Sequence, residues 1–189
     1  NSVGGPTPVE EQIEVSSPTP VAKQIEKSSP TPVVEQTHSY TEIAQAIRPS
    51  VVRIKATDGV GSGFVISGDG LIVTNAHVIG DDSVVEVTLS NGSVRVGKVL
   101  DRNETVDIAL LNIDGYHMPA LDFHSIERPQ VGDEVLAMGY ALDLPGTASL
   151  TKGMVSAFRP KFYGDLTALQ TDTAVNPGNS GGPLVNNDG

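Results

Sequence analysis

The segment NPGNSGGPL, residues 176–184, carries the strongest chemical signal in this chain. Its glycines allow the backbone to approach a ligand closely and to adopt positive φ angles. Its only serine, Ser180, has a hydroxyl that is a poor nucleophile unless a base lies beside it. A serine in such a segment therefore requires a histidine base and an orienting carboxylate elsewhere in the chain.

Both partners occur earlier in the sequence, each next to an apolar run. His77 lies in TNAHV, residues 74–78, and Asp107 opens DIALL, residues 107–111. A histidine can take the serine proton and later return it. A buried carboxylate fixes the histidine tautomer and stabilises the imidazolium. The order His77, Asp107, Ser180 is the chymotrypsin-like order.

The serine motif has one alternative reading, the nucleophile elbow of α/β-hydrolases. Gly178, Ser180 and Gly182 fit the G-x-S-x-G spacing of that elbow, but those enzymes place the serine before the acid and the histidine. No histidine follows Ser180, and strands and helices do not alternate around it. The sequence therefore disfavours the elbow.

From Val51 onward the pattern is one of short strands separated by turns. The segments are rich in β-branched residues and recur about every ten residues, without a long stretch of helical period. SGDG at 67–70 and SNGS at 90–93 are typical of hairpin turns. This pattern predicts an all-β sandwich or barrel. The expected strands are residues 51–55, 63–66, 71–74, 84–89, 94–100, 108–113, 134–139, 149–158, 166–171 and 182–185.

The first 39 residues differ in composition from the rest. They hold six of the 13 prolines and no aromatic residue, and a 12-residue repeat begins at Pro6, Pro18 and Pro30. So polar a segment cannot bury enough apolar area to offset the entropy of ordering. We therefore expect residues 1–39 to be a disordered linker, with a docking motif or a glycosylated stalk as the alternatives.

Ordered structure is expected to begin with a short helix over residues 41–47. Ser39 and Glu42 have the spacing of a capping box, and Pro49 ends the helix because the residue before a proline avoids the α region. PQVGD, residues 129–133, marks a break between two sub-domains. We expect an N-terminal barrel over 40–128 and a partial C-terminal barrel over 129–189.

Composition disfavours several classes of protein. With 12 Lys and Arg against 23 Asp and Glu, the net charge is −11, which disfavours binding to nucleic acid or to anionic lipid. The chain has no Cys, so disulfides, zinc ribbons and thiol catalysis are not available to it. No apolar run approaches the ~18 residues of a spanning helix.

Together, the motifs resemble those of the HtrA/Deg family of trypsin-like serine proteases. TNAHV, DIALL and QTDTAVNPGNSGGPL (170–184) are similar to its three catalytic blocks, and residues 131–157 to the stretch between its acid and its serine. The resemblance covers residues 40–189. It implies a chymotrypsin-like double six-stranded β-barrel, incomplete in its second barrel here, with a short N-terminal helix and the active site between the barrels.

The resemblance also implies a role for each site residue. His77 would be the general base and then the general acid, Asp107 would orient it, and Ser180 would attack the scissile carbonyl. The backbone N–H groups of Gly178 and Ser180 would form the oxyanion hole. The family needs no metal and no organic cofactor.

Two positions depart from the digestive trypsins. Asn179 replaces the Asp that pairs there with a newly cut N-terminal ammonium, so we expect no activation by N-terminal cleavage. In this family loops switch activity instead, and residues 141–149 and those just before Gly178 are the candidates. Ala174 stands where trypsins carry the Asp that selects basic side chains, so we expect a small apolar substrate pocket.

The resemblance predicts a serine endopeptidase of protein quality control that cleaves unfolded or damaged proteins. The alternative is a non-catalytic, protease-like binding or chaperone module. A homo-oligomer is implied, a trimer built near Tyr40, with a PDZ domain downstream. An extracytoplasmic location, in the periplasm or cell envelope, is implied too, with the leader tethering the protease to an upstream anchor. Because the family continues past Gly189 with further strands, we expect residues 1–189 alone to be marginally stable or inactive.

Other conspicuous residues receive plainer interpretations. The glycines of GVGSG, residues 59–63, precede a hairpin rather than a helix, so they indicate turns and not a phosphate loop. The acidic series from Asp101 to Asp107 lacks a calcium loop's glycine and terminal glutamate, at Val106 and Asn112. We expect the remaining histidines to lie on the surface or in loops: His38, His117 and His124.

Overall fold

The computed structural model describes residues 1, 38–115, 117–122, 128–144, 146–163, 165–187 and 189. The chain divides into two units, Asn1–Glu35 and Gln36–Gly189, and every element below belongs to the second. The leader predicted to be disordered lies almost wholly outside the described residues. So does His124.

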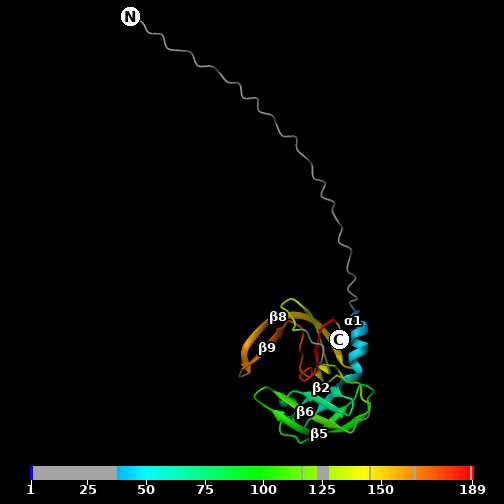
Figure 1. Cartoon of the computed structure of the whole chain (residues 1–189). Coiled ribbons are helices and arrows are strands. Elements are labelled where there is room, and N and C mark those ends of the chain that lie inside the picture. Colours follow the sequence, from blue (N-terminus) through cyan, green and yellow to red (C-terminus); the bar gives the residue numbers. More distant parts are fainter. Residues whose placement is uncertain (2–37, 116, 123–127, 145, 164, 188) are drawn as a thin grey trace. The chain divides into compact units, whose positions relative to one another are not determined.

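The first half of the second unit is a closed antiparallel barrel, drawn in cyan to green in Figure 1. Its strands follow one another around the barrel in the order β1-β2-β3-β6-β5-β4. Their bounds are β1 (Val51–Lys55), β2 (Val60–Ser67), β3 (Leu71–Thr74), β4 (Val84–Thr88), β5 (Val94–Asn103) and β6 (Ile108–Ile113). The fold is mostly β, so the all-β prediction is confirmed.

The barrel interior is filled by β-branched and leucine side chains. β1 shows how alternation builds it, because Val52 and Ile54 are fully buried inside the barrel while Val51 joins a second core on its other side. The strand thus contributes to both cores. The cluster inside the barrel is Val52, Ile54, Val65, Ile72, Val78, Ile79, Val85, Val87, Leu89, Ala109, Leu111 and Ile113.

The second half is an open, four-stranded antiparallel sheet in the order β10-β7-β8-β9. Its strands are β7 (Glu134–Gly139), β8 (Ser149–Tyr163), β9 (Leu166–Thr171) and β10 (Leu184–Val185). It is a second, incomplete sheet, as the resemblance implied. β10 pairs with β7 directly after the segment that carries Ser180, so this pairing places the end of that segment.

Helix α1 (Tyr40–Ile47) covers the second core. Its capping box is formed, since the Ser39 N–H donates to Glu42 Oε2 (2.8 Å) and the Glu42 N–H donates to Ser39 Oγ (3.3 Å). The bond from the Ser39 N–H, and then a bond from the Ser39 hydroxyl to the same Oε2 (2.8 Å), lowers the pKa of Glu42. The helix buries Ile43 and Ile47 in one cluster with Leu136 and Met138 of β7, so its predicted position is confirmed.

A cluster of polar side chains ties α1 to the second sheet. The Tyr40 hydroxyl donates to Glu134 Oε2 (2.7 Å), and the Lys152 ammonium contacts both residues while lying 4.4 Å from the Tyr40 ring centroid. The hydrogen bond from Lys152, and then that from Tyr40, lowers the pKa of Glu134. The same cluster raises the pKa of Lys152.

Several elements differ from the sequence-based expectation at their ends. β2 begins at Val60 rather than at Gly63, β8 runs to Tyr163 rather than to Phe158, and β10 begins only at Leu184. Three short helices were not expected: α2 (Ala76–Ile79), η1 (Arg48–Ser50) and η2 (Ala141–Asp143). Each is too short to show a helical period. No helix within the described ranges is both long enough and apolar enough to cross a bilayer.

Candidate active site

His77 is presented to solvent by a helix whose other residues are buried. β3 ends at Thr74, Asn75 is the N-cap of α2, and the helix buries Ala76, Val78 and Ile79. The His77 side chain is 58% exposed. The hydrophobic neighbours therefore anchor the helix while the imidazole stays accessible to a substrate.

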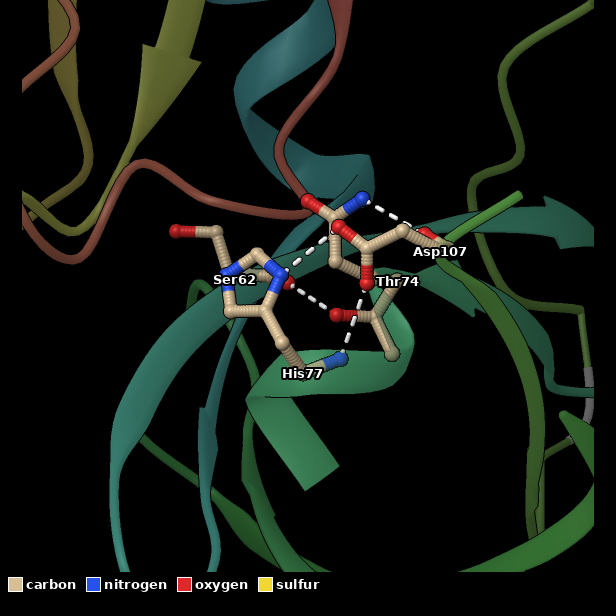
Figure 2. A network of polar contacts seen from close by, with 5 residues as sticks. Ser62, Thr74, His77 and Asp107 are labelled. Atoms are coloured by element: carbon tan, nitrogen blue, oxygen red, sulfur yellow. Dashed lines mark hydrogen bonds and ion pairs between the residues drawn. The ribbon is translucent and has the colours of Figure 1, made fainter. Parts of the chain in front are cut away.

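Asp107 holds His77 through two hydrogen bonds, drawn in Figure 2. Its Oδ2 lies 2.7 Å from His77 Nδ1, and its Oδ1 accepts the His77 backbone N–H at 2.9 Å. The antiparallel pairing of Thr74 with Ala109 sets the ends of β3 and β6 side by side, which brings the two residues together. The predicted histidine–aspartate pair is therefore formed.

The backbone at Asp107 is held in an uncommon conformation. Its φ is 57°, in the left-handed region that residues other than glycine seldom adopt. The Asn75 side chain secures it, because Nδ2 donates to the Asp107 carbonyl at 2.7 Å. No role was predicted for Asn75. Its place in TNAHV, two residues before His77, was the available signal.

The geometry of the pair determines which ring nitrogen carries the proton. The Asp107 side chain is 23% exposed, so it lies partly out of water and close to the imidazole. An ionised carboxylate can only accept hydrogen bonds, which places the proton of the neutral ring on Nδ1. The lone pair of Nε2 is then available to accept a proton.

The segment around Ser180 is fixed through its backbone carbonyls. Four consecutive carbonyl groups each accept a hydrogen bond from a different N–H or O–H group. These are Leu142 N–H to Pro177 O (2.6 Å), Ser62 Oγ–H to Gly178 O (2.6 Å), Gly182 N–H to Asn179 O (2.9 Å) and Ser62 N–H to Ser180 O (2.8 Å).

This arrangement decides where the amides of the segment point. In a trans peptide the N–H points away from the C=O, so a held carbonyl also fixes the next residue's N–H. The amides of Gly178 and Ser180 are directed away from the groups that hold the loop. Neither donates to an acceptor among the residues that the structure describes.

The serine segment lies against the strand that leads to His77. Gly181 has φ 83°, and a Cβ at this position would be 2.3 Å from Thr74 Oγ1 and 3.1 Å from the Asn75 nitrogen. The loop therefore meets β3 where α2 begins. Ser180 is half-buried, and in the described part of the chain its hydroxyl makes no hydrogen bond to His77.

Two further predicted positions have distinct environments. Ala174 is exposed, and its carbonyl accepts a hydrogen bond from Thr151 Oγ1 at 2.9 Å. Asn179 is 6% exposed, and neither atom of its side-chain amide has a partner within the described residues.

The site has neighbours that sequence reasoning did not identify. Ser62 of β2 is fully buried beneath the serine segment, and Tyr140, at the end of β7, donates its backbone N–H to Ser62 Oγ (2.8 Å). Burial raises the pKa of the Tyr140 phenol, although Arg48 and Arg53 act in the opposite direction. Among the described side chains, no cluster of three or more His, Asp or Glu residues is placed to hold a metal ion.

Comparison with known proteins gives a consistent result. Residues 61–189 match the trypsin-like peptidase domain family. The putative serine protease HhoB of Synechocystis sp. is 39% identical over an alignment of 140 residues, and the match covers 68% of this chain and 32% of that protein. A probable periplasmic serine endoprotease, DegP-like, of Pseudomonas putida is 40% identical over an alignment of 139 residues, and the match covers 72% of this chain and 29% of that protein.

A solved structure extends the likeness to three dimensions. The crystal structure of the serine endoprotease from Yersinia pestis matches with a TM-score of 0.71 at 33% sequence identity. The match covers 79% of this chain and 54% of that one. The chain spans about a third of the length of the curated relatives it matches.

Proposed function

We propose that this chain, which belongs to the trypsin-like peptidase family and within it to the HtrA/Deg serine proteases, is the catalytic part of a serine endopeptidase. The observation that carries this proposal is the His77–Asp107 pair, with its 2.7 Å contact, at the strand end against which the Ser180 segment packs. The comparisons support the same reaction class.

The first step uses the base and its orienting acid. With the Nδ1 proton of His77 held on Asp107, Nε2 accepts the proton of Ser180 Oγ. Ser180 Oγ forms a bond to the scissile carbonyl carbon, and the carbonyl π electrons move onto its oxygen. The product is a tetrahedral oxyanion beside an imidazolium, which the Asp107 carboxylate stabilises.

The Gly178 and Ser180 amides would bind this oxyanion. Their direction, away from the groups that hold the loop, supports this role. Such donors act on charge that develops only in the transition state, and each is typically worth ~2.7–4 kcal/mol in rate. The held carbonyls pre-organise the amides before the substrate arrives.

The reaction then completes in two halves. His77 gives its proton to the leaving amine as the C–N bond breaks, which leaves an acyl ester on Ser180. Water attacks this ester and His77 takes the water's proton. The bond between the acyl carbon and Ser180 Oγ then breaks as His77 returns that proton to Oγ, which releases the acid and restores the Ser180 hydroxyl. No metal or organic cofactor takes part in this route.

The relatives support a proposal about substrates and location. They are named serine proteases, and several are named periplasmic. For this protein we infer protein substrates, unfolded or damaged ones in the course of quality control, and an extracytoplasmic location with the leader as a tether. A small apolar pocket at Ala174, a trimer near Tyr40 and a downstream PDZ domain complete the proposal.

We also propose that residues 40–128 and 129–189 are the two barrel domains, and that residues 1–189 alone are only marginally stable. A cavity of about 560 Å³ lies along the second sheet, with Phe64 and Leu184 among its lining residues. Leu184 is 41% exposed and Val131 63% exposed. Apolar surface left in water contributes no burial energy to folding.

The proposed activity is tested with a fluorophosphonate probe, which reacts with an activated serine. The probe is applied to residues 1–189 and to a longer form that continues past Gly189 with the strands expected to complete the second barrel. Ser180→Ala is the negative control in each form. Ser156→Ala, an exposed serine on β8, is the matched control. We expect labelling that Ser180→Ala abolishes and Ser156→Ala keeps.

Each outcome bears on a different part of the proposal. Labelling of the extended form alone supports both the protease and the marginal stability of residues 1–189. Labelling of both forms supports the protease and contradicts the marginal stability. If neither form is labelled, even with peptide activators present, the protease proposal is wrong and a non-catalytic binding or chaperone module is favoured.

A further inference from the structure

Ser62 is a buried hydroxyl next to the proposed site to which the mechanism gives no task. It lies on β2, in the wall of the first barrel, and is fully buried. Figure 2 shows it with Thr74, His77 and Asp107 in one polar network. A buried polar group needs partners, so the partners of Ser62 indicate what it does.

Every hydrogen-bonding group of Ser62 is occupied. Its Oγ donates to the Gly178 carbonyl (2.6 Å) and accepts the Tyr140 N–H (2.8 Å). Its N–H donates to the Ser180 carbonyl (2.8 Å), and its own carbonyl accepts from Thr74 Oγ1 (2.6 Å). One residue of the first barrel is thus bonded to β3, to the end of β7 and twice to the serine segment.

The Tyr140 bond gives the Ser62 hydroxyl a direction. Because one lone pair accepts the Tyr140 N–H, the single hydroxyl proton points at the Gly178 carbonyl. Ser62 therefore fixes the 178–179 peptide through its side chain and the 180–181 peptide through its backbone. The 179–180 peptide, which lies between these two, carries the Ser180 N–H. The 177–178 peptide, which precedes both, carries the Gly178 N–H.

Close packing makes this junction intolerant of change. A Cβ on Gly181 would lie 2.2 Å from the Ser62 carbonyl oxygen, and one on Gly139 would lie 2.9 Å from Ser62 Oγ. So little space leaves no room for a water molecule to replace a lost hydroxyl. Removing Oγ would leave the Gly178 carbonyl and the buried Tyr140 N–H without partners.

We propose that Ser62 is a positioning residue that holds the Gly178 and Ser180 amides in the geometry of the oxyanion hole, and so controls turnover without touching the substrate. This inference rests on the proposed function. It assigns the first barrel a part in transition-state stabilisation, in addition to carrying the base and its acid.

The variant Ser62→Ala should lower kcat and leave KM nearly unchanged. Misplacing oxyanion donors weakens a contact made only in the transition state, for which we expect a loss of roughly 10- to 100-fold. A group that acts only there changes kcat and kcat/KM equally. The rate of fluorophosphonate labelling should fall by a similar factor, since the phosphonyl oxygen occupies the same hole.

The experiment uses whichever form of the chain the fluorophosphonate labels. kcat and KM are measured with a chromogenic peptide, and the affinity for that peptide is measured in the Ser180→Ala background with and without Ser62→Ala. Ile54→Val is the matched control, because this fully buried β1 residue lies in the same barrel but makes no polar contact with the loop. It should lower the Tm without changing kcat.

The outcomes separate a positioning role from a merely structural one. The inference is supported if Ser62→Ala lowers kcat but not the affinity for the peptide, and if Ile54→Val loses a similar amount of Tm without this fall in kcat. A kcat of Ser62→Ala within two-fold of wild type overturns it, as does an equal loss of kcat in Ile54→Val. If Ser62→Ala does not fold, Ser62→Cys replaces it, and its weak S–H donor should give an intermediate rate; an unchanged rate overturns the inference. A wild-type protein that is not labelled refutes the proposed function, and this inference with it.

Discussion

Replacing Asp107 by asparagine changes one atom and should lower kcat by about 10⁴-fold. The two carboxylate oxygens of Asp107 accept two N–H groups of His77, one from the ring at 2.7 Å and one from the backbone at 2.9 Å. Asparagine has one acceptor oxygen, so one of these N–H groups must face an NH₂ group instead. Each of the two possible orientations of the amide therefore disrupts His77.

The magnitude follows from what each orientation does. If the amide NH₂ faces the ring, Nδ1 must become the acceptor and the ring proton moves to Nε2. A protonated Nε2 has no lone pair with which to accept the proton of Ser180. If it faces the backbone, two donors oppose each other at the start of α2. A loss of 10⁴ corresponds to about 5.4 kcal/mol in the barrier, at 1.36 kcal/mol for each factor of ten. Folding stability should fall by only about 1–3 kcal/mol, the cost of one unsatisfied group.

The assay compares kcat on a chromogenic peptide with the midpoint of denaturant unfolding. Asp101→Asn is the control, because it removes the same charge from β5. Among the residues that the structure describes, the Asp101 carboxylate accepts only the neighbouring Arg102 N–H (2.8 Å). We expect full activity from the control and a folded, nearly inactive Asp107→Asn. Activity of Asp107→Asn within ten-fold of wild type would refute the reasoning, because His77 would then not need the carboxylate.

Three further perturbations test the loop and the surface. Gly181→Ala should destabilise the fold by roughly 2–5 kcal/mol, because the new Cβ would overlap a β2 carbonyl and the residue has a positive φ. Gly92→Ala is the control in thermal unfolding, because Gly92 also has a positive φ (81°) but open space around it. The control should lose far less stability. Asn179→Asp should bury a charge without a cation, at about 3–5 kcal/mol, and the loss should grow as the pH rises above about 4; a loss independent of pH contradicts this. Lys152 lowers the pKa of Glu134, so the ionised carboxylate adds folding stability above pH 4.5, and this stability is lost as the pH falls through the lower pKa of the folded state. Glu134→Gln should therefore flatten the acid limb of a plot of Tm against pH. An unchanged acid limb would contradict this prediction.

The sequence predicted best those strands whose apolar or alternating run has a clear beginning and end. β1, β3, β6, β7 and β9 have the predicted bounds. β5 and β8 continue beyond their predicted ends. Their ladders pass irregularities in register, such as the one between Val99 and Asp101, and are held by pairing with β6 and β9. That pairing is tertiary, so no local pattern shows where it ends.

The site shows the same division between local and tertiary information. Residue type and chain order were enough to name His77 and Asp107, and the structure pairs them. The left-handed backbone at Asp107 and the place of Ser62 beneath the serine loop depend on segments far apart in the chain. Ser62 lies in a GSG run that was predicted to form turns, but the structure places this run inside β2. Nothing in the pattern indicates a partner more than a hundred residues away.

The bonds that hold the serine segment also bear on how the site could be switched. Asn179 cannot form the ion pair of the trypsins. The four held carbonyls accept from neutral N–H and O–H groups, and each such bond is worth a net ~0.5–1.5 kcal/mol. Leu142 of η2 supplies one of them, to the peptide that carries the Gly178 amide. Losing about 1.4 kcal/mol changes the ratio of two conformations about ten-fold, whereas complete reversal from 1:99 to 99:1 takes about 5.5 kcal/mol. We therefore expect a contact that moves residues 141–149 to shift the oxyanion hole in graded steps, and a complete switch to require several of the four bonds to change together.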